Sequence, residues 1–248
     1  MRNILLVLSA ADTWTRAGGS KSECGVWAEE FVIMHRRFLE TGNNTVLATP
    51  GGVRPTFDPH SLSAEATAMD VAELKDHLHT FANSLATPRA LHALDREVFD
   101  LIAIPGGYGA LEDLHRDRAL GRILERAWAR DTLIAAVSHG PAALLSARDD
   151  GRRSLFAGRR MTAFSDEEAG ELGAAHHGPW LLASRLREHG VLYERGPKWK
   201  PYVVRDRNLF TGQNPASTHA LVDAVAAALI ASAPHTDSIN GYAGRPSS

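Results

Sequence analysis

Ser138 and His139 are the residues whose type and position most directly suggest chemistry. They follow the uncharged run Leu133 to Val137, which predicts a strand buried on both faces. Gly140-Pro141 comes next, and proline is tolerated in the first turn of a helix. Hydrolases use such a strand–turn–helix as G-x-S-x-G to raise one polar side chain above a sheet, and here Ala136 replaces the first glycine. The pattern predicts a special role for Ser138, with a solvated serine in an ordinary connection as the alternative.

A carboxylate and a glycine turn are the next candidates. Between Gly25 and Glu40, apolar residues recur at helical spacing and predict a core-facing helix. Glu30 lies off this apolar stripe near the helix start, where the helix dipole alone commonly favours a carboxylate. The apolar run Phe99 to Ile104 predicts a buried strand, and Gly106-Gly107 after it can aim backbone N–H groups at a ligand. Glycines at such a place are more often only turn residues.

The elements needed to position these groups alternate along the chain. Further strands are expected at 3–9, 45–49, 200–204 and 208–211, and further helices at 120–128, 179–189 and 213–232. Residues 50–66 are turn-rich, and 68–95 predict short helices over one edge. Together they predict one α/β domain over 1–232, a doubly wound, mostly parallel sheet with helices on both faces. A polar tail, expected to be disordered, follows at 233–248. Ligands are expected at the carboxyl ends of the strands.

Composition excludes several classes of function. The 248 residues include 27 Lys and Arg against 29 Asp and Glu, so nothing favours nucleic acid or an anionic membrane. The chain shows no apolar stretch of membrane-spanning length and no signal peptide, so a cytoplasmic protein is expected. The single cysteine, Cys24, excludes an internal disulfide and a thiolate metal cluster. We interpret His176-His177 as rim residues rather than metal ligands, and expect neither metal nor cofactor.

Five motifs in one order give the chain a family resemblance. It resembles the ThiJ/PfpI superfamily, on the flavodoxin-like fold of class I glutamine amidotransferases, and within it looks most like the heat-shock chaperone/glyoxalase III branch. The matching segments are Gly25-Val26-Trp27-Ala28-Glu29-Glu30-Phe31, Asp58-Pro59-His60-Ser61-Leu62, Pro105-Gly106-Gly107-Tyr108-Gly109-Ala110, Ala136-Val137-Ser138-His139-Gly140-Pro141 with the Ala-Ala-Leu-Leu that follows, and Leu209-Phe210-Thr211-Gly212-Gln213-Asn214-Pro215-Ala216-Ser217.

The departures from the family pattern bear on chemistry. Family enzymes carry cysteine where this chain has Ser138, which is either natural or an engineered replacement. Tyr108 stands where the family's common Gly-Gly-His-Gly has its histidine. Ala169 stands where the family usually has an acid that orients the catalytic histidine. Candidate substitutes for that acid are Glu167, Glu168 and Glu171. Ala183 stands where the family often has a glutamate, after the segment that is Pro179-Trp180-Leu181-Leu182 here. The resemblance implies that Glu30 corresponds to the carboxylate that contacts the family's cysteine.

A serine changes what this site can do. Unlike a thiol, its hydroxyl needs a positioned base, and His139 is an adjacent residue whose side chain is expected to point away from it. A complete Ser-His-acid triad is therefore not expected. A raised-pKa carboxyl at Glu30, the Ser138 hydroxyl, the His139 imidazole and backbone donors at Gly107 and His139 would suit proton transfer around a carbonyl.

Three functions are weighed. The first is a lyase, hydratase or isomerase acting on a carbonyl-containing small molecule, in specialised metabolism, with Glu30, Ser138 and His139 as catalytic residues. The second is glyoxalase III-like conversion of a 2-oxoaldehyde to a 2-hydroxyacid. The third is a non-enzymatic stress or holdase protein. The resemblance further implies a homodimer and substrate contacts from Gly106, Gly107, Tyr108 and Trp180.

Overall fold

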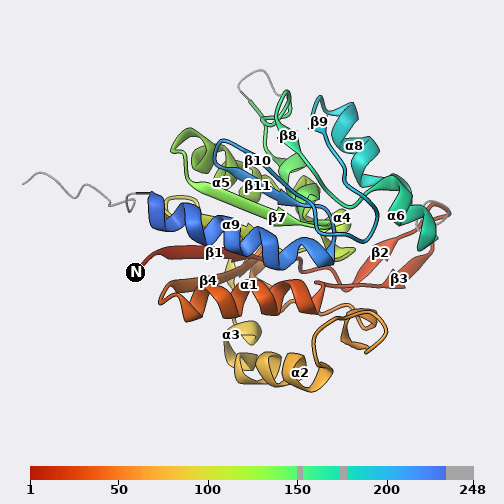
Figure 1. The fold of residues 1–248 in the computed structure, drawn as a ribbon, viewed down its shortest axis with the longest axis horizontal. Coiled ribbons are helices and arrows are strands. Elements are labelled where there is room, and N and C mark those ends of the chain that lie inside the picture. Colours follow the sequence, from red (N-terminus) through yellow and green to blue (C-terminus); the bar gives the residue numbers. More distant parts are fainter. Residues whose placement is uncertain (150–152, 174–177, 233–248) are drawn as a thin grey trace, which may run out of the picture.

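A seven-stranded sheet runs through the centre of the protein, whose computed structural model describes residues 1–149, 153–173 and 178–232 (Figure 1). Across the sheet the strands are β10 (Val203–Asp206), β11 (Leu209–Gly212), β7 (Leu133–Val137), β6 (Leu101–Ile104), β1 (Asn3–Val7), β4 (Asn44–Thr49) and β5 (Arg89–Ala90). Neighbours pair in parallel except for β10 and β11, which form an antiparallel hairpin.

Helices cover both faces of this sheet. On one face lie α1 (Ala28–Glu40) and α9 (Thr218–Ala231), which contact each other (Figure 1). On the other lie α5 (Arg118–Ala129) and the 3-10 segment η5 (Gly140–Ser146). Along β1, Ile4 and Leu6 pack with α1, whereas Leu5 and Val7 pack with α5, because successive strand side chains point to opposite faces. The doubly wound, mostly parallel α/β fold is therefore confirmed.

Shorter elements surround this core. They are the hairpin β2 (Thr13–Thr15) and β3 (Lys21–Glu23), the pair β8 (Arg160–Met161) and β9 (Leu192–Tyr193), the helices α2 (Val71–Thr80), α3 (Ala82–Ala86), α4 (Gly109–Glu112), α6 (Asp166–Glu171) and α8 (Leu182–Glu188), and the 3-10 turns η1 (Pro50–Gly52), η2 (His60–Leu62), η3 (Leu91–Leu94), η4 (Leu114–Arg116) and η6 (Pro215–Ser217).

Several boundaries differ from those that the sequence suggests. The strand expected at 200–204 is Val203–Asp206, and the helix expected from residue 213 begins at Thr218, after η6. The loop through Gly18-Gly19 is the β2–β3 hairpin. The first helix begins at Ala28 rather than Gly25, because Val26 makes a β-bridge to Phe57 and holds this stretch extended. The helix expected at 179–189 begins only at Leu182. The tail 233–248 and the pair His176-His177 lie outside the described residues.

Two features are absent from the described residues. No helix there combines the length and apolarity required to cross a bilayer. Nor does that part of the chain bring three or more His, Cys, Asp or Glu side chains together in a way that could hold a metal ion.

Candidate active site

Ser138 occupies a strained turn directly after the central strand β7. Its φ of 58° lies in the left-handed region, which costs a non-glycine residue about 1–2 kcal/mol. The surroundings hold this conformation: the Ser138 N–H donates to the Gly212 carbonyl at 2.9 Å, and its own carbonyl accepts from the Phe164 N–H at 2.9 Å. A Cβ added at Gly140 would lie 2.4 Å from the Ile104 carbonyl, so the turn needs glycine there. Local strain retained by its neighbours is typical of functional positions.

Glu30 lies beneath this turn, in the first turn of α1, and has no solvent exposure. Its Oε2 accepts a hydrogen bond from the Gly106 N–H at 2.5 Å, while its Oε1 has no partner in the described structure. Burial raises the pKa of this carboxyl from 4.5 to about 8, because desolvation disfavours the charged form. The Gly106 hydrogen bond and then the Ser138 hydroxyl partly oppose that shift. Glu30 can therefore take up and release a proton near neutral pH.

Gly106 is the point at which three elements meet. A Cβ built on it would lie 2.7 Å from the His139 nitrogen, 2.8 Å from Glu30 Oε2 and 2.9 Å from the Ser138 Cβ. Gly107 has a φ of 105°, and a Cβ there would lie 2.2 Å from the Gly25 carbonyl. The glycine turn is therefore required by close approach as well as by backbone conformation.

Two backbone donors are available beside Ser138. The N–H groups of Gly107 and His139 donate to no other group in the described part of the chain, although most buried N–H groups are paired. Both residues line the cleft above the turn. Unpaired N–H groups in that position suit an oxygen that gains negative charge during a reaction.

His139 is placed as an aromatic ring rather than as a base for Ser138. Its ring lies between Tyr108, at a centroid distance of 4.7 Å, and Phe164, at 4.5 Å. Burial lowers the pKa of the imidazole from 6.5 to about 4, which the charge of Glu168 opposes only in part. In the described residues no hydrogen bond joins the ring to Ser138 or to a carboxylate. The geometry thus gives no Ser-His-acid triad.

Glu168 does not act as the missing orienting acid, although it is fully buried. Its Oε1 accepts from the Trp199 N–H, Gln213 Nε2 and Asn214 Nδ2, and its Oε2 accepts from the backbone and hydroxyl of Ser165. These donors hold the pKa of the carboxyl below its usual value despite burial. Glu168 therefore links α6 to the segment that follows β11 and to the loop that precedes β10.

The other substitutes considered for that acid lie at the surface. Glu167 pairs with Arg195, and Glu171 pairs with Lys198. Ala169 packs with Phe164 in a small apolar cluster. Ala169, where the family resemblance led us to look for an acid, therefore contributes packing.

The four residues expected to bind substrate do not all lie at the site. Gly106 and Gly107 form the turn under the site, and Tyr108 lines the cleft beside His139. Trp180 does not line it: its ring lies 5.4 Å from that of His115 and beneath Arg185, within the apolar cluster on the α5 face. The expected contact of Trp180 with substrate is thus not supported.

An open cleft of about 950 Å³ lies above Ser138. Its walls include residues that the sequence did not single out individually for this site, among them Trp14, Trp27, Asp58, His60 and Trp199. Asp58 and His60 lie in one of the five segments on which the family resemblance was based, and the Asp58 carboxylate accepts from the His60 N–H at 2.9 Å. Burial raises the pKa of Asp58. Trp14 and Trp199 come from segments distant in sequence, which no local pattern connects.

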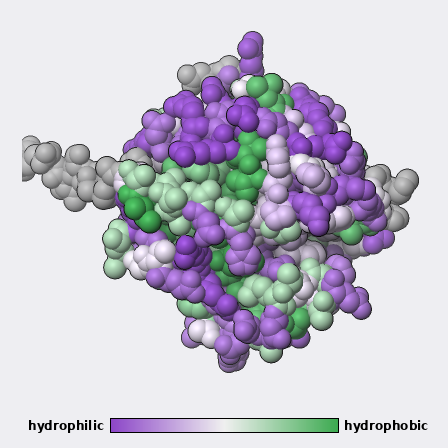
Figure 2. Space-filling model, viewed as in Figure 1, coloured by the Kyte–Doolittle hydropathy of each residue, from purple (hydrophilic) through white to green (hydrophobic). Residues whose placement is uncertain are grey.

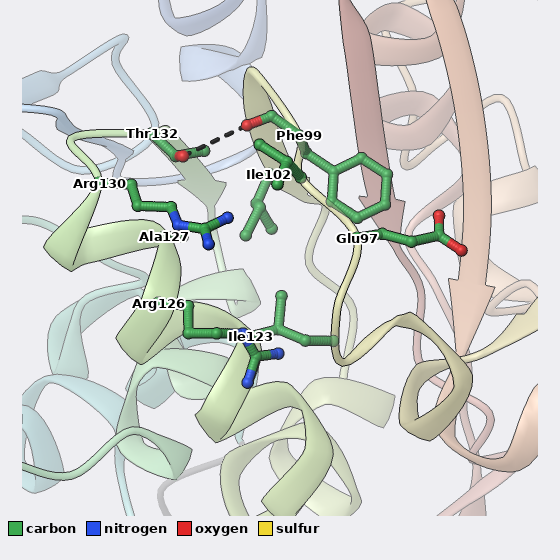
Figure 3. Close-up of a pocket in the computed structure, with 9 residues that line it drawn as sticks. Glu97, Phe99, Ile102, Ile123, Arg126, Ala127, Arg130 and Thr132 are labelled. Atoms are coloured by element: carbon green, nitrogen blue, oxygen red, sulfur yellow. Dashed lines mark hydrogen bonds between the residues drawn. The ribbon is translucent and has the colours of Figure 1, made fainter. Parts of the chain in front are cut away.

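A second hollow lies at the opposite end of the sheet, near the amino ends of β6 and β7 (Figure 3). Phe99, Ile102 and Ile123 line it together with the stems of Arg126 and Arg130. Its volume of about 20 Å³ has room for roughly one water molecule, so it is not a ligand site.

Comparisons with known proteins agree with this fold. The model of the DJ-1/PfpI family matches residues 28–228. The chain belongs to the DJ-1/PfpI family. Among family relatives, it is 31% identical over 175 residues to the bovine (Bos taurus) glutamine amidotransferase-like class 1 domain-containing protein 1, covering 71% of this chain and 76% of that one.

Two further relatives cover more of the chain. The glutathione-independent glyoxalase HSP31 of Saccharomyces cerevisiae is 29% identical over 234 residues, which are 88% of this chain and 94% of the yeast protein. The crystal structure designated APC35852 superposes with a TM-score of 0.81 at 33% identity, covering 93% of this chain and 98% of that one. The resemblance to the glyoxalase III branch is therefore confirmed at the level of family.

Proposed function

We propose that this protein is an enzyme that moves a proton beside the carbonyl group of a small molecule, as a hydro-lyase or an isomerase without a cysteine nucleophile. The observation that carries the proposal is the buried Glu30 carboxyl, which has one unpartnered oxygen and a pKa of about 8. A general acid or base works best when its pKa lies near the operating pH. At neutral pH roughly a tenth of such a carboxyl is ionised, so both forms are accessible.

Ser138 connects Glu30 to the substrate. Ser138 lines the cleft, whereas Glu30 lies below its floor and interacts with the Ser138 hydroxyl. We infer that the ionised carboxyl takes the hydroxyl proton while the serine oxygen takes a proton from the carbon beside the carbonyl. The electron pair of that C–H bond moves into the carbonyl and forms an enolate, whose oxygen accepts from the Gly107 and His139 N–H groups.

The second half of the reaction returns the proton. Protonated Glu30 donates through Ser138 either to another carbon, which gives an isomer, or to a departing hydroxyl, which leaves as water. The His139 ring stays neutral throughout, in keeping with its lowered pKa. Its side chain forms a wall of the site and takes no part in proton transfer.

Hydrogen exchange tests the proposal without knowledge of the natural substrate. Simple ketones are incubated in D₂O with the enzyme, and loss of the hydrogens beside the carbonyl is followed by proton NMR. Wild-type protein is expected to accelerate exchange, and Glu30→Gln is expected to abolish the acceleration. Glu167→Gln is the matched control, since Glu167 is a carboxyl outside the cleft that pairs with Arg195 at the surface. Equal exchange by Glu30→Gln and wild type, or no acceleration by wild type, would overturn the proposal.

A glyoxalase-like conversion of 2-oxoaldehydes to 2-hydroxyacids is the second candidate. It is favoured by the similarity to the yeast glyoxalase over 88% of this chain. In that reaction the Ser138 oxygen would add to the aldehyde while Glu30 takes its proton. The main proposal predicts weak or absent turnover of methylglyoxal. Rapid formation of lactate that Ser138→Ala destroys would favour the second candidate instead.

A further inference from the structure

Five aromatic rings form a continuous wall along the cleft. Trp14 stacks on Tyr108 at a centroid distance of 4.6 Å and an angle of 20°, and Tyr108 lies 4.7 Å from His139. His139 lies 4.5 Å from Phe164, and Phe164 lies 5.6 Å from Trp199. All five residues line the cleft, and Ser138 opens into the same space. We call this series the aromatic wall.

The hairpin fixes one end of the wall. Trp14 is in β2 and only 8% exposed. The next residue, Thr15, donates to the Glu112 carboxylate of α4 from its backbone N–H at 3.0 Å and from its hydroxyl at 3.2 Å. The hairpin, and Trp14 with it, is thereby tied to the segment that follows the glycine turn.

Two carboxylates fix the other end. Trp199 has a φ of 57°, an uncommon conformation for an aromatic residue. Its N–H donates to Glu168 at 2.8 Å, and its indole Nε1 donates to Glu171 at 2.6 Å. A strained backbone held by two carboxylates keeps the ring in place, so the wall is organised before any ligand arrives.

The size of the cleft exceeds what a three-carbon aldehyde requires. Its volume of about 950 Å³ is near the upper end of the range of about 300–1,000 Å³ for sites that hold drug-sized ligands. Ile33, Met69 and Leu172 add further apolar lining. A ligand that filled this space would bury most of its surface against rings and aliphatic side chains.

The charges that line the cleft are mostly negative. Glu23, Glu29, Asp58 and Glu65 line it, and Arg16 is the only Arg or Lys among the described lining residues. None of the four carboxyl groups has an ion pair in the described structure. An anionic ligand would therefore meet net repulsion, which Arg16 offsets only in part.

We propose that the substrate is a carbonyl compound that carries an aromatic ring and no negative charge. The ring packs against the edges of the wall rings, whose faces largely contact one another, and the carbonyl extends to Ser138 and the two free N–H groups. This inference rests on the proposed function only in requiring a carbonyl at Ser138. Aromatic pairs contribute about 0.5–1.5 kcal/mol beyond the area they bury, which is up to roughly tenfold in affinity.

Binding of four ketones tests this inference. Acetone lacks a ring, acetophenone adds one, 4-acetylbenzoate adds a negative charge, and 4-(aminomethyl)acetophenone adds a positive one. Dissociation constants are measured by calorimetry or ligand NMR with wild type and with Glu30→Gln, since binding does not need turnover. Acetophenone is expected to bind about tenfold more tightly than acetone, and 4-acetylbenzoate about tenfold more weakly than the aminomethyl compound.

Three variants connect the binding to the wall. Trp14→Leu removes one end of it, and Trp199→Asn removes the other with a residue that tolerates a positive φ. Each is expected to remove most of the preference for acetophenone over acetone. Trp180→Leu, which removes a tryptophan outside the cleft, is expected to keep it. Equal binding of acetone and acetophenone, tighter binding of 4-acetylbenzoate, or an unchanged preference in both wall variants would overturn the inference.

The two proposals fail in different ways. Ring-selective binding together with exchange that survives in Glu30→Gln would overturn the proton-transfer function and leave the substrate class standing. Loss of exchange in Glu30→Gln without ring selectivity would do the reverse.

Discussion

The Glu30 carboxylate accepts a hydrogen bond from the Gly106 N–H at 2.5 Å, and this contact joins the start of α1 to the turn that follows β6. A Cβ built on Gly106 would also lie within 3 Å of the Ser138 Cβ and of the His139 backbone nitrogen. Gly106 is therefore packed against Glu30, Ser138 and His139 at once. In this arrangement Oε1 of Glu30 is buried and accepts no hydrogen bond in the described structure. The predictions below follow from that geometry.

Glu30 is expected to make the protein less stable as pH rises from about 4.5 to about 8. Below this window the carboxyl is protonated in both folded and unfolded chains, so its contribution to stability is complete. Within it the folded state keeps a proton that the unfolded state has lost, and stability falls by at most about 1.4 kcal/mol per pH unit. Above the folded pKa the contribution is gone.

Urea unfolding across this pH range measures the effect. Glu30→Gln should remove this part of the pH dependence, whereas Glu167→Gln, at an exposed carboxyl paired with Arg195, should retain it. Parallel pH profiles for wild type and Glu30→Gln would contradict the raised pKa.

Cys24 is expected to resist alkylation in the native protein. It is 2% exposed, and burial together with the charge of Asp58 raises the pKa of its thiol to about 12. Ser138→Cys should add one faster-reacting thiol: position 138 is only 3% exposed, but it lines the cleft, and the free N–H groups beside it favour the thiolate. Iodoacetamide labelling followed by peptide mass spectrometry separates the two sites. Rapid labelling at Cys24, or none at position 138, would contradict this difference between the two sites.

Most of the sheet could be predicted from the sequence because burial on two faces leaves a direct pattern. The run Leu133 to Val137 matches β7 residue for residue, and 99–104 differs from β6 only at its start. The β2–β3 hairpin could not be found this way. Its strands have three residues each and are mostly polar, so they carry too few apolar positions to show a period of two.

The site was predictable where a residue lies in a local motif. Glu30, Ser138 and the glycine turn were found through the family pattern, and the structure brings them together. Trp180 lies against the apolar cluster on the α5 face and not in the cleft, since a tryptophan packs in a core as readily as in a pocket. Trp14 reaches the site because it lies in the β2–β3 hairpin, and Trp199 because its backbone is left-handed. No pattern in the sequence predicts either feature.

Glu168 is expected to be a structural residue whose loss destabilises the fold. Glu168→Ala would leave buried donors from Trp199, Gln213 and Asn214 without an acceptor, and we expect a loss of at least about 3 kcal/mol. Glu167→Ala, one residue away, breaks only an exposed pair with Arg195 and should cost less than about 1 kcal/mol. Equal unfolding free energies for the two variants would contradict the assignment.

We expect the protein to form a homodimer, which stays a prediction. Folds of this type commonly bury one face in a two-fold interface, and Figure 2 shows apolar surface over α9, where Ile230 is 84% exposed. Light scattering at micromolar concentration should give twice the mass of one chain. A monomeric mass would count against it.

The most direct test of the account compares turnover of Glu30→Gln and Ser138→Ala on the same ketone in D₂O. Glu30→Gln keeps the shape of the side chain but removes the titrating proton, so exchange should fall to the uncatalysed rate. Ser138→Ala should cost less, about 10²–10³-fold, because a water molecule can replace the missing hydroxyl above Glu30. The reverse ranking, with Ser138→Ala inactive and Glu30→Gln nearly normal, would show a covalent serine mechanism and contradict the account.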